Sequence, residues 1–270
     1  MTEEHRQEQV RLADGLIAAL VKLFERLVDF QNIDSSALEF AKQAAPLVMK
    51  ARYASELLTR DYVKAFDAVE NPNHDPKLLA DLPSDGIDAV DVAGQVATAV
   101  RASMKISVRH GADEGAALEA GKAAATGKAR KLAGDGGRSV LTQFVDKGLG
   151  PVGYARVVDA DPCPFCAMLA SRGVSYTGLM PDGAGLYRTD SFRSSDARFA
   201  GDGRFKVHDN CDCTLEPVYK IDGKIKLPGN GDELAKEWAE IASGRDDPMG
   251  AWRRWRESGT LPEATAAPTT

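Results

Sequence analysis

The sequence predicts an α+β protein, with a mostly helical N-terminal region followed by a small stapled module with a few strands. Three observations support this fold class. Apolar residues in the first half recur at steps of three and four, which is the spacing of one helix face. Short strand patterns separated by turn residues follow after residue 148. All four cysteines lie within residues 163–213, where a cluster can hold a module with little core of its own.

Composition excludes several classes of protein. Hydrophobic residues make up 43% of the 270 residues and charged residues 27%, which is globular and not disordered composition. The net charge of −6 argues against wholesale coating of nucleic acid. Mean hydropathy is −0.29, and we expect no membrane span. The N-terminal residues Met1–His5 are polar and acidic, so we expect no secretory leader and a reducing cytoplasm.

The first two helices are predicted from apolar stripes. Residues 10–28 carry one such stripe, and residues 32–36 interrupt it. Ser36 and Glu39 fit a capping box for the second helix, which Pro46 is expected to start or kink. The residues expected to face inward on this helix are Leu38, Phe40, Leu47, Val48, Tyr53, Leu57, Leu58, Tyr62, Val63 and Phe66.

A third helix is expected from Asp88 to Arg109, and an alanine-rich fourth from Ala112 to Ala133. The run Gly134–Gly137 is expected to end the fourth helix. Basic residues on and just after this helix form a locally positive stretch, which we interpret as a solvated face. They are Lys122, Lys128, Arg130, Lys131 and Arg138.

The second half of the chain is predicted to hold short strands and helices. Residues 154–158 are expected to form a strand and residues 214–227 a strand and hairpin with a type I′ turn at Asp222-Gly223. A helix is expected over residues 231–243, and residues 171–204 are loop-like. The predicted divisions are a helical region at 1–148, a cysteine module at 149–230, C-terminal helices at 231–261 and a disordered tail at 262–270.

The cysteines supply the main chemical signal. Cys163 and Cys166 form a C-x2-C pair, and His208, Cys211 and Cys213 form a distant H-x2-C-x-C. Zn²⁺ prefers four nitrogen and sulfur ligands in a tetrahedron, so the second region is predicted to be a zinc-stapled module. Five candidates compete for four positions: either all four cysteines bind, or His208 replaces Cys211 or Cys213.

Closing the 41 residues between Cys166 and His208 is entropically unfavourable, and a metal would offset that cost. A site closed by four protein ligands leaves no position for water, so the zinc is expected to be structural. Two alternatives remain open: disulfides formed in an oxidising medium, and plain buried thiols.

The cysteine region resembles a known protein family. Residues 154–158, residues 161–173 and the run His208-Asp209-Asn210-Cys211-Asp212-Cys213 resemble the Mu F-like minor head (head morphogenesis) proteins of tailed phages, in the form carried by phages of actinobacteria. The resemblance covers roughly residues 138–220. The family pattern is a cysteine pair and a distant H-P-N-C-R-C, from which this chain departs at Asp209 and Asp212.

The resemblance implies a minor capsid protein acting in head assembly. Its implied partners are the portal protein and/or the major capsid protein, at the portal or the inner face of the capsid. Its implied location is the virion, in the phage head, after assembly in the host cytoplasm, and no small-molecule substrate is implied. Relatives are often labelled capsid maturation proteases, so the alternative function is a head maturation protease that cleaves capsid or scaffold proteins.

The residues themselves favour a structural role over catalysis, and they assign no catalytic residue. A serine protease needs a hydroxyl beside a histidine. Of the four histidines, His5 lies in an expected frayed terminus and His74 in a Pro/Asn loop. His110 ends a helix, and His208 belongs to the cysteine cluster. No G-x-S-x-G surrounds Ser171, Ser191, Ser194 or Ser195.

A weaker alternative is contact with DNA. Residues 252–256 interleave tryptophan with arginine, a pairing that can stack on bases or bind phosphate. We interpret this segment as a helix whose tryptophans pack and whose arginines face water or a protein. The basic stretch around Arg130 offers a second weak contact, either to DNA or to an acidic capsid surface.

Overall fold

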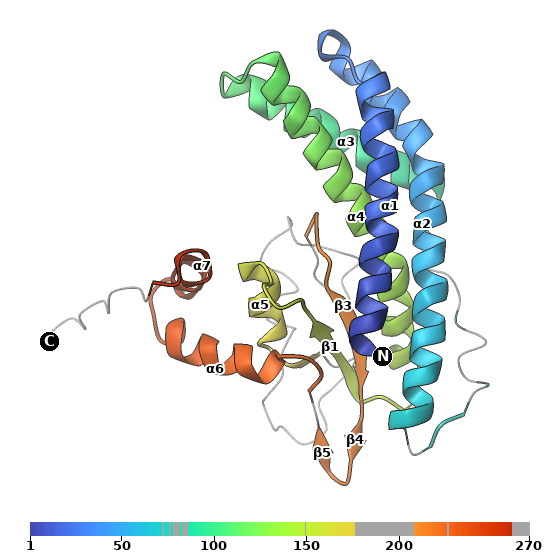
Figure 1. The fold of residues 1–270 in the computed structure, drawn as a ribbon, viewed down its shortest axis with the longest axis vertical. Coiled ribbons are helices and arrows are strands. Elements are labelled where there is room, and N and C mark those ends of the chain that lie inside the picture. The colour runs from blue at the N-terminus through green and yellow to red at the C-terminus, as the bar shows by residue number, and fades with distance from the viewer. Residues whose placement is uncertain are drawn as a thin grey trace, which may run out of the picture. The chain divides into compact units, whose positions relative to one another are not determined.

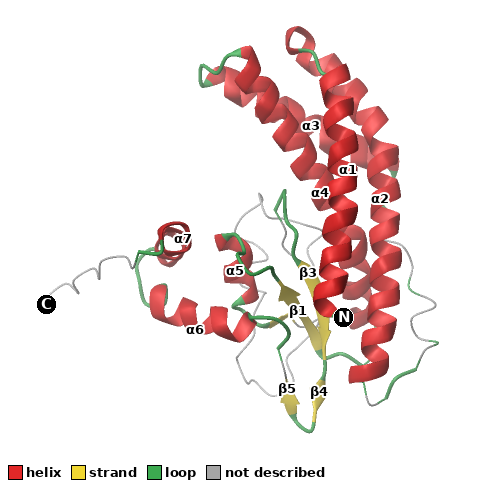
Figure 2. Cartoon of the chain, in the orientation of Figure 1, coloured by secondary structure: helices red, strands yellow, loops and turns green. Residues whose placement is uncertain are grey.

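The computed structural model describes residues 1–71, 73–75, 77, 82, 86–148, 150–175, 208–225 and 227–260. Helices dominate the first half, and the strands come later (Figure 2). The predicted α+β class is therefore confirmed. The chain divides into two compact units, one built on residues 1–148 with residues 208–212, the other on residues 150–175 and 213–260.

The described residues of the first unit form a bundle of four helices (Figure 1). They are α1 (Thr2–Leu27), α2 (Ile33–Glu70), α3 (Ala89–Arg109) and α4 (Glu114–Asp146), with a short 3₁₀ turn, η1 (Phe30–Asn32), between the first two. The third helix agrees with its predicted bounds to within one residue. Asp88 caps it, because its carboxylate accepts hydrogen bonds from the amides of Val90 and Asp91.

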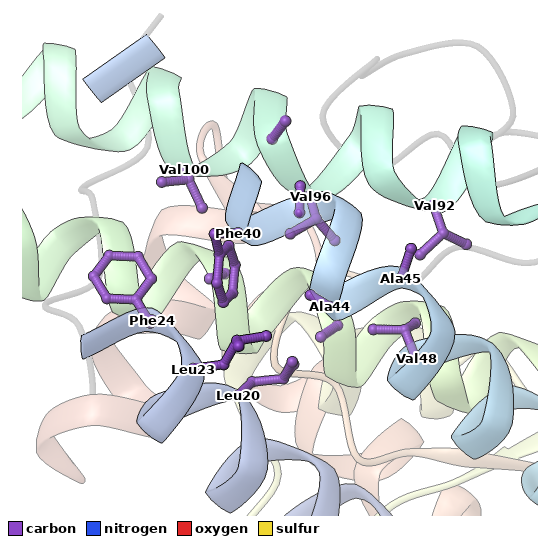
Figure 3. Packing of buried hydrophobic residues seen from close by; sticks show 14 of the residues in the cluster. Leu20, Leu23, Phe24, Phe40, Ala44, Ala45, Val48, Val92, Val96 and Val100 are labelled. Atoms are coloured by element: carbon purple, nitrogen blue, oxygen red, sulfur yellow. The ribbon is translucent and has the colours of Figure 1, made fainter. Parts of the chain in front are cut away.

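Side chains from α1, α2 and α3 interlock in the bundle core (Figure 3). The rings of Phe24 and Phe40 meet edge to face, with centroids 5.4 Å apart. Leu20, Val48 and Val100 belong to the same cluster and are fully buried. Burying each such side chain contributes roughly 1.5–3 kcal/mol, so this cluster supplies much of the stability of the bundle.

The second helix begins earlier than predicted. It starts at Ile33, and Ser36 lies inside it, where its hydroxyl donates to the carbonyl of Asn32 (2.8 Å). The capping carboxylate is that of Asp29, which accepts from the amide of Gln31 and caps η1. Pro46 lies within α2 and does not start it. The capping-box prediction was therefore wrong.

The inward face of α2 is also only partly as predicted. Phe40, Val48, Tyr62 and Val63 are buried as expected. Other large residues predicted to face inward are exposed, namely Leu38, Leu47, Tyr53 and Leu57. The buried face is lined instead by small residues, Ala37, Ala41, Ala44, Ala45 and Ala51. Small side chains let neighbouring helices approach closely. Alanines therefore line the buried face of α2, where the larger leucines had been predicted.

The fourth helix does not end at the glycine run. It continues through residues 134–137 to Asp146. The reason is packing against α2: a Cβ at Gly136 would lie 2.3 Å from the backbone oxygen of Arg52. Glycine there permits a close helix–helix approach, and this tertiary contact overrides the low helix propensity of glycine.

The basic stretch of α4 is not a solvated face, and this prediction was wrong. Its five side chains are 4% to 21% exposed. Each contacts a carboxylate within the unit. Lys122 pairs with Glu119 and Glu25, Lys128 with Asp209, Arg130 with Asp14 and Asp212, and Lys131 and Arg138 both with Asp135.

The N-terminus is packed and not frayed. His5 is 5% exposed and stacks on Tyr62, with ring centroids 4.3 Å apart and planes 8° from parallel. Burial lowers the pKa of His5 to about 4. Next to it, Gln9 donates to the hydroxyl of Thr59 (3.0 Å) and to the carbonyl of Ser55 (3.1 Å). The first turns of α1 are therefore fixed on α2.

The second unit is built on a three-stranded antiparallel sheet in the order β2-β1-β3. Its strands are β1 (Gly153–Val157), β2 (Val174–Ser175) and β3 (Thr214–Val218). The hairpin β4 (Lys220–Ile221) and β5 (Lys224–Ile225) turns at Asp222 and Gly223, whose φ angles are 49° and 77°. Two positive φ values are the signature of a type I′ turn, as predicted.

The part of this unit that the structure describes also contains three helices: α5 (Pro164–Ala170), α6 (Gly231–Ile241) and α7 (Pro248–Ser258). Trp252 of α7 is fully buried and donates its indole N–H to the carbonyl of Pro164 (2.7 Å). Its ring lies 5.3 Å from that of Trp238 on α6. The arginine–tryptophan segment is thus a helix, as predicted, but of its two tryptophans only Trp252 is buried, and Trp255 is half-buried.

Some predictions fall on residues that the structure does not describe. Most of the predicted loop at 171–204 and all of the predicted tail at 262–270 lie outside the described residues. The predicted divisions of the chain stay predictions. In the described part of the chain, no helix combines the length and the hydropathy that crossing a bilayer requires.

Replacing Gly136 by alanine is expected to destabilise the bundle by about 1–3 kcal/mol, because the new Cβ would collide with backbone. Gly94→Ala is the matched control, since it adds the same methyl group to α3 where nothing lies within 4 Å. That variant is expected to gain up to about 1 kcal/mol from helix propensity. Urea unfolding of both variants measures the difference, and equal effects would contradict the close approach.

Acid is expected to destabilise α1 through His5. An unfolded chain protonates this histidine near its ordinary pKa of 6.5, whereas the folded protein resists protonation down to about 4. Stability from this group is therefore complete above pH 6.5 and is lost as the pH falls toward 4, by about 2 kcal/mol at pH 5. His5→Phe keeps a stacking ring and should lose this part of the pH dependence, whereas the exposed-site control His110→Gln should retain it.

Candidate metal centre

The first half-site is a turn that leads into α5. Cys163 is the N-cap residue of this helix, and its sulfur accepts a hydrogen bond from the amide of Cys166 (3.4 Å). Pro164 occupies the first helical position, where its fixed φ and missing N–H suit the helix start. Cys163 is exposed and Cys166 is buried. The C-x2-C spacing thus brings two sulfurs to the same turn.

The second half-site directly precedes β3. Cys211 and Cys213 are 3% and 5% exposed. Asn210 adopts a left-handed conformation (φ 64°), and its amide donates to the carbonyl of Gly127 on α4 (3.2 Å). Nδ1 of His208 lies 2.5 Å from the carbonyl oxygen of Asp209, which can only accept. Nδ1 therefore carries the proton, and Nε2 keeps the lone pair that a metal ion needs.

The predicted ligands group into two overlapping sets that could hold a metal ion. The ligand atoms of Cys163, Cys166 and His208 lie within 4.8 Å of one another, and so do those of Cys166, Cys211 and Cys213. Sulfur atoms in a tetrahedral zinc–thiolate site are about 3.8 Å apart, as follows from a Zn–S bond of about 2.3 Å. The donor atoms and their spacing fit Zn²⁺. None of the four cysteines, all within the described residues, forms a disulfide.

Cys213 has a cationic neighbour that the sequence did not predict. The guanidinium of Arg156, on β1, donates to the sulfur of Cys213. Arg156 is itself buried. A positive charge beside a sulfur stabilises the thiolate, which is the form that binds metals. Which four of the five predicted residues bind stays a prediction.

Sequence reasoning also missed the residues of α4 that contact the second half-site. Arg138 donates to the carbonyl of Cys211 (3.0 Å), and Arg130 pairs with Asp212. Gly127 accepts the amide of Asn210. One signal was present in the sequence: Asp209 and Asp212, where the motif departs from H-P-N-C-R-C, are the residues that pair with Lys128 and Arg130.

Comparison with protein-family models matches residues 1–241 to the family described as VG15 protein. The chain belongs to the VG15 family. This is a family of viral proteins from phages, which agrees with the phage origin that the resemblance implies. No curated protein matches the chain, and no solved structure matches it. As a VG15 protein the chain is phage-associated, and the match covers both the bundle and the cysteine cluster.

Protein purified under reducing conditions is expected to contain about one zinc ion per chain. Cys166, which belongs to both ligand sets, should be essential, so Cys166→Ser should lose the zinc and destabilise residues 150–260 more than the bundle. Metal content and proton release on zinc addition measure this. His110→Gln, which removes a possible ligand elsewhere, should keep full content. Absence of metal from fresh reduced wild-type protein would refute the zinc site.

Proposed function

We propose that this VG15 protein is a minor capsid protein acting in tailed-phage head assembly, at the portal or the inner capsid face. The observation that carries the proposal is the match to a phage protein family over residues 1–241. The resemblance of the cysteine motif to Mu F-like head proteins supplies the finer role. The proposed partners are the portal protein and/or the major capsid protein, and the proposed location is the phage head.

The bundle offers surfaces suited to such partners. The 38 residues of α2 make a helix about 57 Å long at 1.5 Å per residue. Its outer side exposes Tyr53 and Leu57, which are 59% and 44% accessible. Large apolar side chains on a helix surface are typical of protein contacts, and aromatic residues are enriched in them.

The cysteine cluster supports a structural role. Four protein ligands close the coordination of a zinc ion and leave no position for a reacting water. In this proposal the ion fixes residues 163–166 and 208–213, which have few apolar side chains of their own. The proposed cofactor is therefore a structural Zn²⁺, held by four of Cys163, Cys166, His208, Cys211 and Cys213.

One observation favours the alternative, a head maturation protease. Nδ1 of His74 lies 2.6 Å from the buried carboxylate of Asp67, the kind of pairing that orients a catalytic base. Among the described residues, the ring of His74 hydrogen-bonds to Asp67 and its backbone amide donates to the carbonyl of Asn71 (3.2 Å), and neither bond reaches a hydroxyl or thiol. His5 is buried against Tyr62. The described part of the chain therefore provides a histidine and the carboxylate that orients it, but no nucleophile hydrogen-bonded to that histidine.

Contact with DNA has less support than the sequence suggested. The basic side chains of α4 are matched by carboxylates, and Arg256 of α7 lies 3.4 Å from Glu237. Charges already paired within the protein contribute little to phosphate binding, because each contact would first have to break an ion pair.

Phage heads assembled with this chain are expected to contain it as a low-copy component after gradient purification. Heads assembled without it are the control. The major capsid protein should have the same intact mass in both preparations, because the proposed role involves no cleavage. Quantitative mass spectrometry of the two preparations measures both quantities.

A capsid protein that is shortened only in the presence of this chain would overturn the structural proposal in favour of the protease. Two variants then separate the possible bases. Loss of cleavage in His74→Ala would assign the Asp67–His74 pair, and loss in His208→Ala would assign the cysteine cluster. Absence of the chain from heads of unchanged mass would refute the head role itself.

A further inference from the structure

A short segment of the second half-site is bound to α4 far more closely than a connecting loop requires. At Gly127, a Cβ would lie 2.7 Å from the side-chain nitrogen of Asn210 and 2.8 Å from its oxygen. The amide of Asn210 donates to the carbonyl of Gly127 (3.2 Å). The left-handed turn at Asn210 therefore rests directly on the helix backbone, in a place that only glycine leaves open.

Charges on both sides of this turn match the helix. Asp209, before it, pairs with Lys128 (2.8 Å), and Asp212, after it, pairs with Arg130. Arg130 also contacts Asp14 on α1 (2.7 Å), so one guanidinium joins α1, α4 and the segment. The side chain of Arg130 is 14% exposed, whereas those of Asp14 and Asp212 are 58% and 34% exposed, so solvent screens the contact with Asp14 more than the contact with Asp212.

The backbone between the two carboxylates is held by a buried cation. Arg138 is 5% exposed, its Nη2 donates to the carbonyl of Cys211 (3.0 Å), and its Nη1 contacts Asp135 (2.8 Å). Asp135 in turn accepts from Lys131 (2.7 Å). The peptide of Cys211 is thus fixed by a guanidinium whose own position is fixed by a carboxylate one turn away on the same helix.

We propose that Gly127, Arg130 and Arg138 are positioning residues for the metal centre: α4 holds residues 209–212 in the conformation that presents Cys211 for binding. This proposal rests on the zinc site argued above, not on the role in the phage head. In this proposal the helical bundle contributes to metal binding by positioning the ligands, although none of the residues of α4 is itself a ligand. It follows that zinc loading stabilises α4, because the ligand segment and the helix are held together.

The test is a charge swap between Arg130 and Asp212, read out by zinc affinity in competition with a chromophoric chelator. Arg130→Asp and Asp212→Arg each place like charges together and are expected to weaken zinc binding by about 10-fold to 100-fold, the usual effect of losing an outer-shell contact. The double variant restores opposite charges between positions 130 and 212 and should bind zinc more tightly than either single variant, because the two sites are coupled. Recovery is expected to be incomplete, since the carboxylate at position 130 then faces Asp14. Lys122→Asp, which alters another paired cation of α4, should bind as wild type.

Two further measurements keep folding and binding apart. Circular dichroism checks that each variant retains its helices, and Asp212→Asn removes the charge without repulsion, so an intermediate loss is expected. Hydrogen exchange of wild-type protein should slow around residues 127–138 when zinc is added. Single variants that bind zinc as wild type, or a double variant no better than the singles, would overturn the positioning role. Wild-type protein that binds no zinc would overturn it together with the metal centre, whereas a failed head association would leave it intact.

Discussion

The close packing of α4 constrains the rest of the helical unit. This helix contacts α1, α2 and α3, and at Gly136 the carbonyl of Arg52 comes too near for any side chain. Glycine in mid-helix costs roughly 0.5–1 kcal/mol, which burial of the surrounding side chains offsets. The approach also makes polar contacts necessary, because buried arginines need partners: Arg52 donates to the carbonyl of Leu132.

At Gly127, too, the absence of a side chain permits a close contact, here between α4 and the cysteine segment, residues 208–213. Residues 208–213 have little apolar surface, so polar contacts must hold them. Two buried guanidiniums lie beside this run, Arg138 at the carbonyl of Cys211 and Arg156 at the sulfur of Cys213. Four thiolates around Zn²⁺ would leave two net negative charges, and three thiolates with a histidine would leave one. Buried cations next to such a site offset that charge and reduce the cost of removing it from water.

The sequence was informative where one local pattern decides the structure. The stripe of α1, the bounds of α3 and the Asp222-Gly223 turn depend on neighbours a few residues away, so their patterns predicted them. The predicted ligands are likewise defined by short spacings. The path of α4 through Gly134–Gly137, the burial of His5 and the partners of Arg130 depend on residues that lie far away in the chain. No local period contains such information, and propensity alone pointed to the wrong answer at the glycines.

The cysteine run resembles the Mu F-like pattern, and α4 accounts for the two positions at which it departs from that pattern. Where the family pattern has proline and arginine, this chain has Asp209 and Asp212, and the helix behind them carries Lys128 and Arg130. An arginine at position 212 would face Arg130 at the distance of an ion pair, and like charges so close repel. The cysteines and the histidine fix the chemistry of the motif, whereas its variable positions must match the charge of the helix that supports it. A protein that has this cysteine pattern with arginine at that position is therefore expected to lack a basic residue at the position of Arg130.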